Sequence, residues 1–220
     1  MKDPYIYQDT GTLINKLGIK DEEKLRKAEA NISFVKLLTV DRDVPCEKFD
    51  LEYLKNIHKY VLGDIYDWAG EFRTVPMFKE EKILAGDSVR YSYPTEIKPK
   101  ALEYLDEINR INWNVMDVDE KSLKFTKLIA GLWQVHPFRD GNTRTTVTYA
   151  FRFAEEHGFP MQRQLLLDNF EYVRGGFVWA SQGEYSNYEY LNKIINDAIK
   201  REATARSGKD VNRKQEDDGR

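Results

Sequence analysis

The sequence has little that would tie it to an oxidising compartment or to a membrane. Cys46 is the only cysteine among 220 residues, so no disulfide can form within the chain, as is usual in a reducing compartment. No apolar run approaches the roughly 20 residues that span a bilayer, and residues 1–20 lack the apolar centre of a cleavable signal. We therefore expect a cytoplasmic protein. Delivery into another cell by a route without a cleavable signal stays open.

An excess of positive charge is also missing. The formal net charge is −3 at pH 7, from 34 basic and 37 acidic side chains. Nucleic acids and anionic lipids attract proteins through clusters of Lys and Arg, and no long basic patch occurs here. We expect no direct nucleic-acid binding and no membrane association, which excludes a helical DNA-associated regulator.

What the sequence does contain is helical periodicity. The clearest helix has a good cap in Asp50 and a stop in Gly63, with its apolar side chains on one face. Similar patterns predict an all-α fold built from residues 21–38, 50–63, 94–113, 119–135, 144–158, 165–182 and 188–203. We expect one domain over residues 21–202, after an N-terminal extension (1–20) and before a disordered polar tail (203–220) without an apolar anchor.

One segment, residues 71–94, breaks the helical rhythm. It is rich in β-branched and aromatic residues and contains two prolines. This composition predicts a short β-hairpin or an extended flap. Pro76 favours an edge position, where the remaining backbone groups face solvent or a ligand.

The ten residues "HPFRDGNTRT", from His136 to Thr145, place reactive groups between two apolar helical segments. This loop joins the end of one helix to the start of the next, where free backbone N–H groups attract anions. Gly141 and Asn142 favour backbone conformations that point consecutive amides at one place, and Arg144 adds a guanidinium suited to phosphate oxygens. The loop is therefore predicted to bind phosphate.

Further side chains would give such a loop a chemistry. Asp140 could hold Mg²⁺ together with phosphate oxygens, and His136 could take a proton near neutral pH. Phe138 is expected to place its ring in the core and fix the loop. Taken singly, each residue has a structural alternative: His136 in the core or at a helix end, Asp140 as a helix cap, and the Gly-Asn pair as an ordinary turn. The set predicts transfer of a phosphorus centre to a hydroxyl that His136 deprotonates.

The stretch "HPFRDGNTR" resembles the signature of the Fic/Doc family, H-x-F-x-[D/E]-[G/A]-N-x-R, at every fixed position. "IYDWAGEFRTV" is similar to the family's approach to its flap, and "YIYQDTGTLINKLGIK" to the start of many members. The resemblance implies an all-helical Fic fold with a short β-hairpin flap. It also implies a protein adenylyltransferase, which moves AMP from ATP to a serine, threonine or tyrosine hydroxyl of a target protein.

The signature also implies roles for single residues. By match to it, His136 is the general base, Asp140 the Mg²⁺ ligand and Phe138 the core anchor. The donor's phosphates would be held by an anion hole of Gly141, Asn142, Thr143 and Arg144. An extended segment of the target would pair by strand addition with the flap residues Thr74, Val75, Pro76 and Met77. Lys79, on the same segment, is expected to be an exposed lysine, with contact to donor or target as the less favoured alternative.

The sequence departs from the family pattern at two positions after the loop asparagine. Many members that transfer AMP have glycine where this chain has Thr143, and a second arginine where it has Val147. A kinase of the Doc type, another phospho-group transferase, or a degenerate module that only binds a nucleotide or a partner therefore stays open. The inhibitory pattern [S/T]-x-x-x-E-[G/N] of many members is absent, since the nearest stretch, "SYPTEI", ends in Ile97. We expect a toxin-like protein restrained by a separate small antitoxin.

Overall fold

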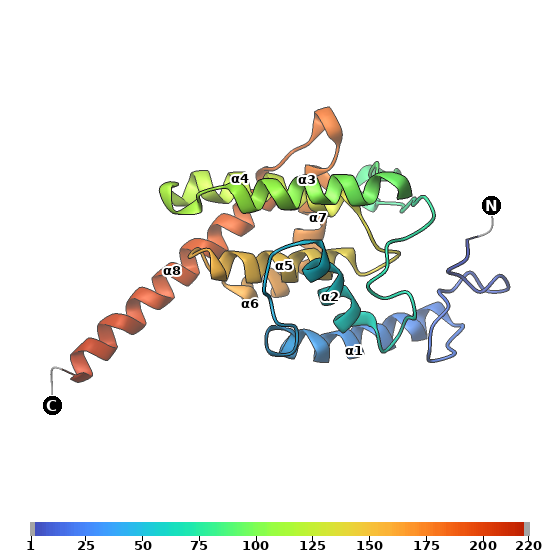
Figure 1. Cartoon of the computed structure of the whole chain (residues 1–220), viewed down its shortest axis with the longest axis horizontal. Coiled ribbons are helices and arrows are strands. Elements are labelled where there is room, and N and C mark those ends of the chain that lie inside the picture. The colour runs from blue at the N-terminus through green and yellow to red at the C-terminus, as the bar shows by residue number, and fades with distance from the viewer. Residues whose placement is uncertain (1–2, 218–220) are drawn as a thin grey trace.

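The computed structural model of the chain describes residues 3–217 and is helical, as the sequence predicted (Figure 1). None of the helices described there has the length and apolar character needed to cross a bilayer. The α-helices are α1 (Glu22–Asp43), α2 (Leu51–Leu62), α3 (Ile97–Arg110), α4 (Val118–Val135), α5 (Asn142–Glu156), α6 (Arg163–Asp168), α7 (Phe170–Ala180) and α8 (Glu189–Asp217). Short 3₁₀ turns lie at Lys82–Leu84, Pro94–Glu96, Trp113–Val115 and Gly183–Tyr185.

Aspartates begin several of these helices by accepting backbone N–H groups that have no partner within the helix. Asp21 caps α1 by accepting from the amide of Lys24. Asp50 caps α2, as predicted, and accepts from the amide of Tyr53 at 2.9 Å. Asp117 does the same for α4. Each cap is worth about 1 kcal/mol and fixes where the helix starts.

Helix α5 lies in the middle of the bundle, where it contacts α2 on one side and α4 on the other (Figure 1). Helix α4 in turn contacts α3, α7 and α8, so its C-terminal half is buried almost all round. Aromatic rings fill the core, among them Phe125, Trp133 and Phe153. The loop between α4 and α5 therefore starts inside the protein on a rigid support.

The segment 71–94 forms an extended loop without a β-ladder, so the predicted β-hairpin is wrong in its strands. Exposed and less exposed side chains alternate from Arg73 to Glu80, which is the period of a strand. Two turn bonds, from the Glu81 amide to the Asp87 carbonyl and from the Gly86 amide to the Glu81 carbonyl, fold the chain back. The arms are then too irregular to pair, partly because Pro76 has no N–H to donate. We call residues 71–94 the flap.

The two ends of the chain also differ from the expected appendages. Residues 3–20 are fastened to the domain, for example by the Lys16 amide, which donates to the Ile65 carbonyl at 2.8 Å. At the other end, helix α8 continues to Asp217, so the segment expected to be a disordered tail is helical from residue 203 to 217. Residues 218–220 of the predicted tail lie outside the described part of the chain.

Candidate active site

His136 follows the last residue of α4 and has a left-handed backbone, with φ 51° and ψ 60°. This conformation is uncommon for residues other than glycine and needs support from its surroundings. The His136 amide donates to the Trp133 carbonyl at 3.0 Å, and the His136 carbonyl accepts from Nε of Arg73 at 2.8 Å. Arg73 is itself buried and also donates to the carbonyls of Val75 and Ser92. The guanidinium of Arg73 thus ties the flap to the start of the loop between α4 and α5.

The imidazole of His136 is buried and has one nitrogen free. Its Nδ1–H faces the Trp133 carbonyl at 3.3 Å, and the ring packs on Tyr91 with centroids 4.0 Å apart. Within residues 3–217, Nε2 has no hydrogen-bond partner. Burial, and then the charges of Lys79 and Arg73, lower the pKa of His136 well below its usual value. The ring is therefore neutral at pH 7, with the Nε2 lone pair available to a proton donor.

Glycine at position 141 is required by space as well as by conformation. Gly141 has φ 75°, and a Cβ built there would lie 2.4 Å from Cδ1 of Leu62. Helix α5 begins at the next residue, and Gly141 provides no side-chain cap. The amides of Asn142, Thr143 and Arg144 in the first helical turn therefore have no acceptor within residues 3–217. They form the positive end of helix α5, which begins six residues after His136 in the chain.

The Asn142 side chain stabilises the loop from inside. Its Oδ1 accepts from the Phe138 amide at 2.9 Å, and its Nδ2 donates to the Phe138 carbonyl at 2.8 Å. The Phe138 ring is buried and stacks on His58, with centroids 3.8 Å apart. The sequence-based interpretation assigned Asn142 to the donor's phosphates. In the structure its amide side chain instead joins the two ends of the loop.

Asp140 lies at the mouth of the loop as an ionised carboxylate. Burial opposes its ionisation, but Lys79, Arg144 and the Gly141 amide lower its pKa below the usual value. Oδ1 accepts from the Gly141 amide at 2.7 Å and from the Lys79 ammonium at 3.4 Å. Lys79 is therefore not the exposed flap lysine that the sequence suggested.

Asp140 is suited to a metal that phosphate oxygens also bind. Within residues 3–217, no group of three or more His, Cys, Asp or Glu gathers to hold a metal by itself. A hard cation such as Mg²⁺ commonly takes one or two carboxylates together with substrate phosphates and water. The carboxylate of Asp140, beside free helix-start amides, fits that donor set.

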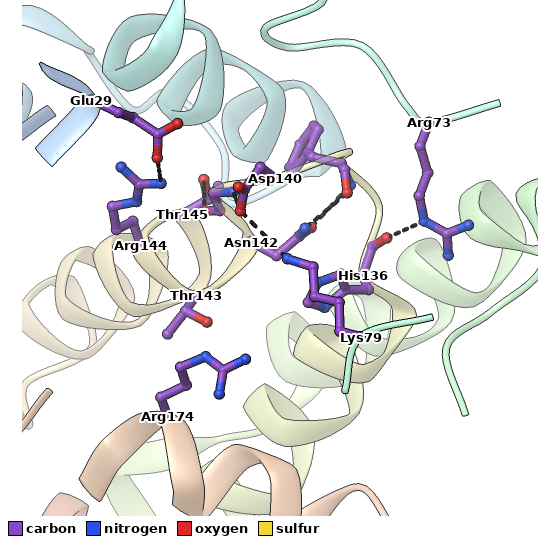
Figure 2. A network of polar contacts seen from close by, with 12 residues as sticks. Glu29, Arg73, Lys79, His136, Asp140, Asn142, Thr143, Arg144, Thr145 and Arg174 are labelled. Carbon is purple, nitrogen blue, oxygen red and sulfur yellow. Dashed lines mark hydrogen bonds and ion pairs between the residues drawn. The ribbon is translucent and has the colours of Figure 1, made fainter. Parts of the chain in front are cut away.

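The side chains of Arg144 and Thr143 point in different directions from α5 (Figure 2). Arg144 is ion-paired with Glu29 of α1 and donates to Oγ of Ser33 at 2.9 Å. Thr143 Oγ1 accepts from Nε1 of Trp133 at 2.9 Å. Both residues border the predicted phosphate site, and each is already held by a neighbouring helix.

The predicted target-docking residues Thr74, Val75, Pro76 and Met77 lie in the extended arm of the flap next to the loop. The Arg73 amide donates to the Pro137 carbonyl at 2.9 Å, which fixes the start of this arm. The Thr74 amide donates to the Tyr5 hydroxyl at 3.0 Å, and the Val75 carbonyl accepts from Arg73. The chain thus already uses part of the edge that was predicted to be open.

The sequence-based interpretation missed the charged residues that approach the loop from other helices and the flap. Glu29 comes from α1, Arg73 and Glu81 come from the flap, and Arg174 comes from α7. Arg174 donates from both terminal nitrogens to the two oxygens of the buried Glu81 carboxylate, at 2.7 and 2.8 Å. Figure 2 shows the Arg174 guanidinium on the Thr143 side of the loop, away from Glu29. No local pattern marked Glu29, Glu81 or Arg174, because the partner of each lies far away in the sequence.

Comparisons with known proteins agree with this geometry. The model of the Fic/DOC family matches residues 48–154. The chain is 32% identical over 158 residues to protein adenylyltransferase VbhT of Bartonella schoenbuchensis. The aligned region covers 71% of this chain and 32% of VbhT. It is 26% identical over 206 residues to a protein adenylyltransferase of Bartonella henselae, covering 89% of this chain and 38% of that protein.

A solved structure has the same fold. The crystal structure of BepC, a VirB-translocated effector protein of Bartonella tribocorum with bound AMPPNP, superposes with a TM-score of 0.73 at 22% identity. The match covers 88% of this chain and 95% of that one.

The chain spans about a third of the length of the two curated relatives named above. The family match includes both the flap and the loop from His136 to Arg144. Residues 48–154 of the chain thus form a Fic/DOC domain.

Proposed function

We propose that the domain is a protein adenylyltransferase that moves AMP from ATP to a serine, threonine or tyrosine hydroxyl of a target protein. The observation that carries this proposal is the free Nε2 of His136, neutral and buried, beside the amides that begin α5. A free base next to an anion-binding helix start suits the attack of a hydroxyl on a phosphate.

In the proposed reaction, the target's hydroxyl oxygen forms a bond to the α-phosphorus of ATP. The bond between that phosphorus and the oxygen bridging to the β-phosphate breaks, and pyrophosphate leaves. The hydroxyl proton passes to Nε2 of His136, whose Nδ1–H keeps the ring oriented toward the Trp133 carbonyl. The amides of Asn142, Thr143 and Arg144 would face the negative charge that develops on the transferred phosphate. Mg²⁺ at Asp140 would neutralise part of the charge of the donor's phosphates.

The relatives support the same assignment. VbhT and the Bartonella henselae protein are named protein adenylyltransferases, and the BepC structure contains AMPPNP, an ATP analogue. The flap would hold the target, because Thr74 and Pro76 are exposed on an extended segment whose residue Arg73 contacts the His136 carbonyl. The proposal for the donor is thus supported by the loop, and the proposal for the acceptor by the flap.

The test is labelling by ATP that carries the isotope at either the α- or the γ-phosphate. The purified protein, Mg²⁺ and a panel of target proteins should yield α-labelled protein. His136→Ala should lose at least about 100-fold of this label, because removal of a general base typically costs 10²–10⁴-fold. Label from the γ-phosphate alone would show a kinase of the Doc type instead. Nucleotide binding without either label would favour a binding module.

We also propose that the protein acts in the cytoplasm as a toxin restrained by a separate small antitoxin. The support is the missing inhibitory pattern in the sequence. Co-expression with the product of the neighbouring open reading frame should give a complex that co-purifies and labels targets more slowly than the free chain. Two proteins that purify apart, with unchanged labelling, would contradict this.

A further inference from the structure

The cations around the loop differ in how firmly they are already bound. Arg73 donates to the carbonyls of His136, Val75 and Ser92. Loss of these bonds would release the backbone at His136. Arg144 pairs with Glu29, which also accepts from the Tyr66 hydroxyl, so that contact joins helices of the core. Arg174 instead pairs with Glu81 of the flap, and Lys79 is itself a flap residue that pairs with Asp140. They are the cations whose partners can exchange.

Arg174 is placed beside the helix start by packing that does not involve Glu81. Phe177, one turn later on α7, stacks on Trp133 with centroids 5.3 Å apart. The indole of Trp133 donates to Thr143, the second residue of α5. Figure 2 shows the Arg174 guanidinium reaching toward Thr143. This places a planar, permanently charged group on the Thr143 side of the start of α5.

Glu81 is a carboxylate in an unusual place. Its side chain is only 3% exposed, whereas that of Arg174 is 34% exposed. It sits in an irregular turn, directly before the 3₁₀ turn Lys82–Leu84, with no regular element to hold it. Two oxygens on a guanidinium fork are also the contact that a phosphate makes with arginine. The flap therefore presents to Arg174 the same chemistry that a polyphosphate would.

We propose that Arg174 binds the polyphosphate of the donor nucleotide and that the Glu81 carboxylate stays ion-paired with Arg174 until the donor binds. The inference rests on the proposed function, since it names a further residue for the same donor. Donor binding would exchange the Glu81 carboxylate for phosphate oxygens at Arg174. It would also exchange Lys79 for Mg²⁺ at Asp140, so the ion pair of the flap with α7 and its ion pair with the loop would open together. Arg174 lies outside residues 48–154, which match the family, so the family match assigns it nothing.

The experiment compares Arg174→Gln, Glu81→Gln and the double variant in binding of AMPPNP and of AMP, with Mg²⁺, by calorimetric titration. Arg174→Gln should weaken AMPPNP binding about 10- to 100-fold, the range for loss of a charged hydrogen bond, and AMP binding less. Glu81→Gln should bind AMPPNP at least as tightly as the wild type, because the competing charge is gone. Arg206→Gln is the matched control, since Arg206 pairs with Glu155 and Glu202 on the exposed side of α8.

The double variant tests whether Arg174 binds the donor or only stabilises the flap through Glu81. Arg174→Gln alone leaves the buried Glu81 charge unpaired and can loosen the flap, whereas two glutamines restore a neutral pair. The double variant should therefore regain thermal stability and still bind AMPPNP weakly. Two results would overturn the role of Arg174: wild-type affinity for AMPPNP in the double variant, or equal losses of AMPPNP affinity in both single variants. If the wild type still transferred the α-label, the proposed transferase activity would stand in either case. A wild type that neither binds AMPPNP nor labels targets would overturn both.

Discussion

His58 and His136 are two buried, neutral imidazoles on either side of the same loop, and they serve different purposes. His58 uses both nitrogens: Nε2–H donates to the Asp140 carbonyl at 2.9 Å, and Nδ1 accepts from the Gly70 amide at 2.8 Å. His136 uses Nδ1 alone and leaves Nε2 without a partner in the described part of the chain. Burial lowers both pKa values, so the pKa alone would not tell the two apart. The number of ring nitrogens that have a hydrogen-bond partner distinguishes them.

This comparison explains why a buried histidine can be either part of the scaffold or part of the chemistry. A buried polar atom without a partner costs free energy, so folding stability alone would not select it. The left-handed backbone at His136 adds a second cost at the same residue. Stability is thus given up at His136 and supplied nearby, by the bonds of His58, Asn142 and Arg73.

The largest effect on stability should come from His58→Ala, which tests the structural role of His58. The change leaves the Asp140 carbonyl and the Gly70 amide unpaired and opens a cavity against the stacked Phe138 ring. We expect a loss of about 3 to 5 kcal/mol in the free energy of unfolding, measured by urea denaturation. His157→Ala is the matched control with a smaller expected loss, because within residues 3–217 the His157 ring, at the C-cap of α5, has a hydrogen bond only to the Phe153 carbonyl of that helix.

His136→Ala should have the opposite profile in the same measurements. It removes an imidazole with an unsatisfied nitrogen, so we expect a smaller loss of stability than in His58→Ala, together with loss of α-labelling. If His58→Ala kept full stability and lost labelling, His58 would belong to the chemistry and the comparison would fail.

The part of the site that could be predicted from the sequence is the part that is local. His136, Asp140, Gly141 and Arg144 lie within ten residues, and free amides at a helix start follow from helix geometry alone. The helices followed from periodicity, and even the flap has the period of a strand. The missing β-ladder and the continued α8 depend on which segments meet, and the pattern of one segment does not contain that information.

Long-range charge pairs are the other part that the sequence could not reveal. Glu29 meets Arg144, and Glu81 meets Arg174, across 115 and 93 positions of the chain. Acidic and basic residues are abundant, and a helical pattern places most of them on solvated faces. Only the tertiary arrangement of α1, α5, α7 and the flap brings these four residues into their pairs.

The smaller effect, which sharpens the comparison, is the dependence of stability on pH. Burial lowers the pKa of His58 to about 4 from an ordinary value of 6.5, and that of His136 also falls well below 6.5. Below pH 6.5 the unfolded chain therefore binds protons that the folded chain does not, so stability falls as the pH falls. The contribution of His58 is complete above pH 6.5 and is lost toward pH 4, by about 3 kcal/mol. Urea unfolding between pH 4 and 8 should show this slope, and His136→Ala should reduce it by up to about 1.4 kcal/mol per pH unit while keeping the share of His58. An unchanged slope in His136→Ala would mean that His136 takes up its proton as readily in the folded protein as in the unfolded chain, which would contradict the lowered pKa of the buried ring.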